Sequence, residues 1–163
     1  IKQLEKGEKL DLSSGEDLSV GIMNLIAIEE HLFFSGGKTG KVKYYDLLNE
    51  VRKLRVELLR EIIKNEQGEE WCISKHLLSA SMRLMEVGTK ALKTGEKAKA
   101  YALFEKSYHL YNLFWGLNLG LVKEGEMKVP NLEKKEAPLP LKQADFFGKI
   151  SNAIGKILDC CKE

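Results

Sequence analysis

Apolar residues recur at helical intervals along most of this chain. Between residues 41 and 64 they repeat at steps of three and four, which places them on one side of a helix. Residues 14–35 are apolar almost throughout, so we expect this first helix to lie at the centre of a bundle. Its interruptions are Asn24, Glu29, Glu30 and His31. The apolar residues of the second segment are Tyr44, Leu47, Leu48, Val51, Leu54, Leu58 and Ile62.

Capping and turn signals divide the chain into four long helices. Ser13 or Ser14, followed by Glu16, is a typical helix start with an acidic first turn. The predicted helices span residues 14–35, 41–64, 69–93 and 96–122, and Gly36, Gly68 and Gly95 mark the breaks between them. All three prolines lie between residues 130 and 140, so no proline interrupts a helix in the first 129 residues. The pattern predicts an all-α fold, an antiparallel four-helix bundle over residues 1–123.

The last part of the chain has a different pattern. Residues 124–142 contain the prolines, and we interpret them as an extended linker. Residues 143–163 predict a short amphipathic helix, which Gly148 and Gly155 weaken by roughly 1 kcal/mol each relative to alanine. Because such a helix is marginal alone, we expect it to dock on the bundle or on a second subunit. Its apolar contact residues are Phe146, Phe147, Ile150, Ile154 and Ile157.

Composition narrows the class of protein. A chain of 163 residues fits one compact unit, and a formal charge of +2 gives no strong attraction to nucleic acid. No uncharged apolar run of about 18 residues is present to span a bilayer, so we do not expect a membrane as the partner. Three cysteines, two of them adjacent, make a poor disulfide framework. We therefore expect a cytoplasmic protein.

The residues best suited to bind a metal ion or to line a site lie in the third predicted helix. Its polar side chains recur at steps of four, three, four, three and four, so they form one stripe, which is either a solvated face or the lining of a site. The stripe consists of Cys72, His76, Ser79, Arg83, Glu86 and Lys90. Cys72 and His76 are spaced to share a zinc ion, but the chain has no Cys-x-x-Cys pair to complete the site. A half-buried cysteine and a surface histidine are the simpler interpretation.

Two adjacent carboxylates, Glu29 and Glu30, stand on the apolar first helix, where a carboxylate needs a cationic partner. The candidate partners are Arg52, Arg55, Arg83 and His76. We interpret these residues as a structural buried ion pair, with a catalytic carboxylate as the alternative. No Glu-x-x-His pair of the di-iron type occurs, and no phosphate-binding loop is present.

The third and fourth helices resemble one tetratricopeptide hairpin over residues 80–112. The resemblance rests on small residues at Gly88, Ala91 and Ala100 and on Phe104, with Leu84 before them. It implies close packing of two antiparallel helices and a peptide-binding role. Since no second copy follows about 34 residues away, we interpret the segment as a single helix pair rather than a solenoid.

Two hypotheses follow from these patterns. The first is a noncatalytic helical module that binds a protein partner or forms a homo-oligomer, with no cofactor. The second is an interior small-ligand or metal site, with an enzyme as its stronger form. The residues of that second site are Glu30, Arg55, Cys72, His76, Arg83 and Glu86.

Overall fold

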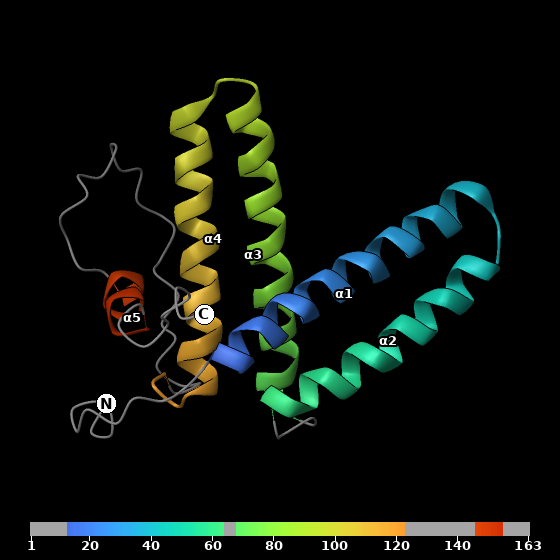
Figure 1. Cartoon of the computed structure of the whole chain (residues 1–163), viewed down its shortest axis with the longest axis horizontal. Coiled ribbons are helices and arrows are strands. Elements are labelled where there is room, and N and C mark those ends of the chain that lie inside the picture. The colour runs from blue at the N-terminus through green and yellow to red at the C-terminus, as the bar shows by residue number, and fades with distance from the viewer. Residues whose placement is uncertain (1–12, 64–67, 123–145, 155–163) are drawn as a thin grey trace.

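A computed structural model describes residues 13–63, 68–122 and 146–154, and these residues are helical except at short turns (Figure 1). The helices are α1 (Ser13–Thr39), α2 (Lys43–Ile62), α3 (Glu69–Lys93), α4 (Lys97–Asn118) and α5 (Phe146–Ile154). The four long helices pack together as an all-α bundle, which confirms the predicted fold class. The predicted linker lies outside the described residues.

Glycine determines where these helices end, although not always where the sequence pattern predicted. The break expected at Ser35-Gly36-Gly37 is wrong, because α1 continues to Thr39 and stops at Gly40, whose φ is 66°. Gly36 serves packing instead: a Cβ there would lie 2.6 Å from a ring carbon of Tyr45 in α2. Gly120, with a φ of 67°, ends α4 several residues before the predicted boundary. A left-handed conformation of this kind is nearly free only for glycine.

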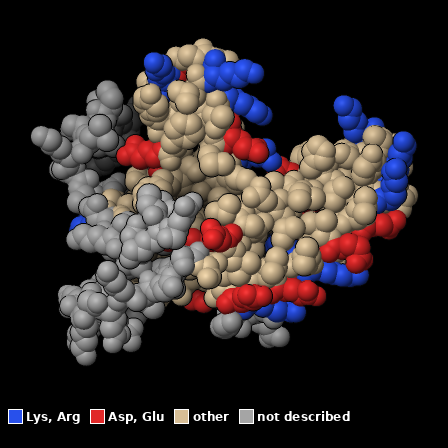
Figure 2. Space-filling model, in the orientation of Figure 1, with Lys and Arg blue, Asp and Glu red and all other residues tan. Residues whose placement is uncertain are grey.

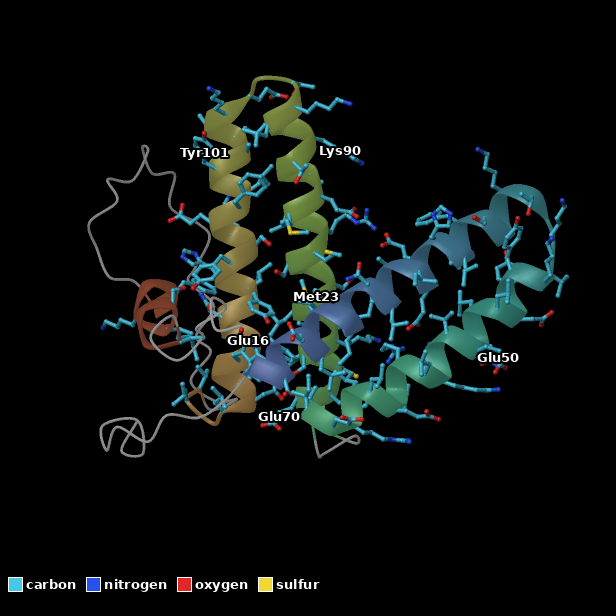
Figure 3. All side chains as sticks on the ribbon, viewed as in Figure 1. Glu16, Met23, Glu50, Glu70, Lys90 and Tyr101 are labelled. Atoms are coloured by element: carbon cyan, nitrogen blue, oxygen red, sulfur yellow. The ribbon has the colours of Figure 1, made fainter. Side chains whose placement is uncertain are left out.

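The bundle consists of two helical hairpins that diverge from a shared base (Figure 1). Helices α3 and α4 pack against each other closely, and α1 packs against α2. Near its start, α1 crosses α3, and Met23 lies at this crossing (Figure 3). From the crossing, α1 and α2 extend to one side as a limb whose tip lies away from α3 and α4. We call this projecting hairpin the α1–α2 limb.

The hydrophobic core lies at the base, where both hairpins meet. Each long helix contributes a fully buried side chain to it: Ile22, Leu59, Leu78 and Phe114 show no exposed surface. Burial of each such side chain stabilises the fold by about 1.5–3 kcal/mol. Trp115 packs edge-on against Phe114, with ring centroids 5.1 Å apart. The aromatic residues of α4 therefore reach the core only at its base end, since Tyr101 and Tyr108 are exposed.

The divergence of the hairpins corrects two expectations. Helix α1 does not lie at the centre of the bundle, because large apolar residues of its far half, such as Phe33 and Phe34, are exposed. Leu84 and Phe104, which we expected to lie in the core because of the close helix packing that the resemblance implies, are only half-buried. Both results have the same cause: beyond the crossing, each hairpin packs only against itself, so one side of every helix faces solvent.

Candidate functional site

The polar stripe of α3 is mainly a solvated helix face. Cys72, His76 and Lys90 are exposed, and the Cys72 thiol is free. Arg83 differs, because its guanidinium donates from Nη1 to Glu86 Oε2 at 2.7 Å and from Nη2 to Glu30 Oε2. The stripe therefore contacts another helix, α1, through Arg83.

The cluster of Glu30, Arg83 and Glu86 joins the two hairpins near the surface. Its side chains are 39%, 48% and 40% exposed, so water and salt screen the charges. Exposed ion pairs of this kind contribute up to about 1 kcal/mol to stability. The guanidinium bonds one carboxylate from α1 and one from α3, so this cluster links the two helices.

The buried ion pair is formed by the neighbouring carboxylate, Glu29. Arg55 Nε donates to Glu29 Oε1 at 2.7 Å, and Nη2 donates to Oε2 at 3.1 Å. The side chains of Arg55 and Glu29 are only 3% and 14% exposed. Two parallel hydrogen bonds suit the planar guanidinium fork, and they compensate the loss of water around both charges. This contact ties α1 to α2 inside the limb.

The six residues predicted for an interior site do not converge on one place. Glu30, Arg83 and Glu86 meet near the surface, whereas Arg55 is buried against Glu29 between α1 and α2. The exposed positions of Cys72 and His76 put both in solvent. Within residues 13–63, 68–122 and 146–154, no three His, Cys, Asp or Glu side chains are arranged to hold a metal ion. The other two cysteines of the chain, Cys160 and Cys161, lie outside the described residues.

A cavity of about 560 Å³ opens at the base, between the start of α1 and the ends of α2 and α4. Its described lining consists of Ser14, Gly15, Leu18, Glu61, Ile62, Trp115, Asn118 and Leu119. Glu61 is the only one of these lining residues with a carboxyl, amine, imidazole or thiol group. A lone exposed carboxylate lacks a second acid, base or nucleophile within this lining with which to carry out catalysis.

A buried hydrogen bond joins α1 to α4 close to this cavity. The Ser19 hydroxyl donates to the Glu16 carbonyl oxygen at 2.7 Å and lies 2.7 Å from the Tyr111 hydroxyl. Because the serine proton is used on the carbonyl, the tyrosine hydroxyl donates to the serine oxygen. Burial raises the pKa of Tyr111 above its ordinary value.

The predicted contact residues of the tail are partly described. Helix α5 packs against α4 through Ile150 and Ile154, which are buried. Phe147 stacks on His109 with ring centroids 5.8 Å apart. A hydrogen bond of 3.1 Å from Asn112 Nδ2 to Ser151 Oγ accompanies these apolar contacts. The side chain of Phe146 and the whole of Ile157 lie outside what is described. In this structure the described stripe of α5 is covered by α4.

The sequence analysis missed an apolar surface of the α1–α2 limb that no described helix covers. Glu29 and Arg55 face each other across the antiparallel hairpin, so the residue before each, Ile28 and Leu54, lies on the same side of the limb. Glu30, the residue after Glu29, points to the opposite side, toward α3. Ile28 and Leu54 are 45% and 48% exposed, which agrees with a side that no described helix covers.

We call this side the outer face. It consists of Ile28, Leu32, Leu47, Val51, Leu54 and Leu58. Leu47 is 52% exposed, whereas Leu32, Val51 and Leu58 are half-buried. In Figure 2 the limb has a broad surface without charged residues, with Lys and Arg gathered at its tip and Asp and Glu along α2. The apolar row of α2 was visible in the sequence. Its steps of three and four residues are the same for a face that lies in the core and for a face that lies at the surface, so the sequence did not show that this row is exposed.

Helix α1 has the length and apolar composition of a membrane-spanning helix. The segment Ser14–Thr39 is long and apolar enough to cross a bilayer, with a mean hydropathy of 1.3. Core helices of soluble proteins and signal sequences often have the same length and apolar composition, so these two properties do not identify a membrane span. The ion pair of Glu29 lies within this segment.

Comparison with known proteins adds no relative. No protein-family model matches the chain, and neither curated proteins nor solved structures yield a match. The functional argument therefore rests on the geometry described above.

Proposed function

We propose that this protein is a noncatalytic helical interaction module and that its binding surface is the outer face of the α1–α2 limb. The observation that carries this proposal is the uncovered apolar face, on which Ile28, Leu47 and Leu54 are each about half exposed. Contiguous exposed apolar patches on folded proteins mark interaction sites, because leaving them in water is unfavourable.

The architecture supports the same interpretation. A helical hairpin that projects from the bundle presents its outer face without obstruction from α3 or α4 (Figure 1). The limb is held together by the buried pair of Glu29 and Arg55, so its two helices present one preformed surface. A preformed surface loses less conformational entropy on binding than a disordered segment does. The module is proposed to act in the cytoplasm.

Photo-crosslinking in living cells tests this proposal. A photoreactive amino acid at position 54 is compared with the same residue at position 101, which lies at the far end of α4 (Figure 3). Both positions are about half exposed, so the two variants are matched in access to solvent. We expect protein adducts from position 54, including adducts between copies of the chain, and few from position 101. Equal yields at both positions, or none at position 54, would remove the outer face as the binding surface.

A further inference from the structure

We infer that the occupant of the outer face is the outer face of a second copy of this chain, with the two α2 helices antiparallel. The inference rests on the proposed function and names the partner. Three observations carry it: the spacing of the apolar residues on α2, their self-complementary order, and the separation of charge between the tip and the base of the limb.

The apolar residues of α2 have the spacing of a helix-packing seam. Leu47, Val51, Leu54 and Leu58 follow steps of four, three and four, and Tyr44 extends the row by three. This is the spacing of the a and d positions of a coiled coil, which pair with an equivalent row on another helix. Leu47 and Leu54 are about half exposed, whereas Leu58 packs partly against the core, so the middle of the seam has no complete partner among the described helices.

The order of these residues suits an antiparallel pairing of two copies. When α2 packs against the α2 of a second copy in the opposite direction, Leu47 meets Leu58, and Val51 meets Leu54. Both contacts then occur twice, as a two-fold symmetric interface requires. Ile28 and Leu32 of α1 lie on the same side of the limb and widen the interface on both copies.

Charge selects the antiparallel orientation over the parallel one. The tip of the limb is basic, with Lys38, Lys41 and Lys43 exposed, whereas Glu61 is exposed at the base end of α2. Antiparallel pairing places Lys43 beside Glu61 of the second copy, but parallel pairing brings Lys43 beside Lys43. Glu50, on the edge of α2 away from α1 (Figure 3), is neutralised by Lys53 at 2.7 Å. Opposite charges at the rim of an interface fix its register.

The same charges favour a protein over a bilayer as the occupant. Glu57 and Glu61 border the seam along α2, whereas Glu50 is paired with Lys53. Acidic side chains beside an apolar face oppose binding to anionic lipid surfaces, which attract lysine and arginine instead. A second copy supplies both the apolar surface and the lysine residues that match this border.

The oligomeric state of the purified chain of residues 1–163 tests the inference. Sedimentation equilibrium over a range of protein concentrations should show a monomer–dimer equilibrium for the natural sequence. Leu54→Glu should raise the dimer dissociation constant at least about tenfold, because each interface then buries two unpaired carboxylates. Tyr101→Glu is the matched control, since Tyr101 is equally exposed but lies at the far end of α4. This control should leave the dissociation constant unchanged.

A charge exchange tests the orientation and does not depend on the folding of the Leu54 variant. Lys43→Glu and Glu61→Lys should each raise the dissociation constant several-fold, because each creates two like-charge contacts per dimer. The double variant should return it to within about twofold of the natural value, since the pair is restored with its charges reversed. Additive effects in the double variant would overturn the antiparallel arrangement.

The outcomes separate this inference from the proposed function. A chain that remains monomeric at all concentrations, while position 54 crosslinks other proteins in cells, overturns the second copy as occupant and leaves the interaction surface in place. A monomer whose position 54 gives no protein adducts overturns both. Recruitment to vesicles of anionic lipid that Leu54→Glu abolishes, without dimerisation, assigns the face to a membrane and overturns both as well.

Discussion

At the scale of single residues, Glu29 and Glu30 show how one step along a helix changes the role of a carboxylate. A step of one residue turns a side chain by about 100° around the helix axis. Glu29 therefore points across the hairpin to Arg55 and is buried, whereas Glu30 points to Arg83 and is half exposed. The sequence predicted a buried ion pair for these two glutamates and named both arginines as candidates, but it did not decide which glutamate would be buried.

The first prediction concerns this buried pair. Glu29→Leu should lower the free energy of unfolding by about 3–5 kcal/mol, because it leaves the Arg55 guanidinium buried without a counterion. The double variant Glu29→Leu/Arg55→Met should recover most of that loss, since no unpaired charge remains. Urea denaturation at one protein concentration measures both effects.

Glu30→Leu is the matched control, because it removes the neighbouring, exposed carboxylate. We expect a change of about 1 kcal/mol or less. If the two single variants lose equal stability, or if the double-mutant cycle shows no coupling between Glu29 and Arg55, the pair does not stabilise the limb as described.

The second prediction concerns the dependence of stability on alkaline pH. Burial raises the pKa of the Tyr111 hydroxyl in the folded state, so folding favours the neutral phenol. The stability from this group is present below the unfolded pKa of about 10 and is lost as the pH rises through the higher folded value. The unfolding free energy should therefore fall above about pH 10, and Tyr111→Phe should make this fall less steep.

Tyr101→Phe controls for this effect, since Tyr101 is exposed. Its substitution should leave the slope of stability against pH unchanged. The measurement is chemical denaturation between about pH 8 and pH 11, and equal slopes for the natural chain and Tyr111→Phe would show that this phenol does not contribute.

At the scale of helices, close approach within each hairpin depends on glycine inside a helix. Gly88 on α3 faces Phe104 on α4, and a Cβ at Gly88 would lie 2.7 Å from a ring carbon of Phe104 and 3.3 Å from the carbonyl oxygen of Ala100. The sequence identified these residues as a closely packed pair. The observed contact gives the physical reason for the small residue at position 88.

The third prediction follows from this contact. Gly88→Ala should lower the free energy of unfolding by about 1–3 kcal/mol, because the helices must separate or the Phe104 ring must shift to admit the methyl group. Gly21→Ala, in the exposed part of α1, meets no atom within 4 Å and should stabilise the chain by up to about 1 kcal/mol. A loss of stability for Gly88→Ala with a gain for Gly21→Ala supports the close contact of Gly88 with Phe104. A gain of stability for both substitutions contradicts that contact.

At the scale of the whole molecule, the angle between the two hairpins decides which surfaces remain available. The hairpins share a core only at the base, so the far half of the limb has no cover from α3 or α4 (Figure 1). Helix α5, predicted as an interaction element, packs against α4, where Ile150 and Ile154 are buried. The outer face of the limb is an apolar surface that no described helix covers, and both the proposed function and the proposed dimer rest on it.

The sequence by itself determined the local structure of this protein. Periodic apolar residues, capping groups and glycine turns act within a few residues of one another, so they predicted the four long helices and the all-α class. Helix ends were less certain, because Gly36 was taken as a break although it lies within α1 and packs against Tyr45. A glycine has the same sequence signature in both roles.

Only the tertiary structure decided which apolar faces are buried. The steps of Leu47, Val51, Leu54 and Leu58 are the same whether they face a core or solvent, since periodicity fixes a side of the helix and not its neighbour. The angle between the hairpins, which depends on contacts between residues far apart in the chain, left that side uncovered. The same long-range packing buried Glu29 and exposed His76, and so placed the candidate site on the limb rather than on the stripe of α3.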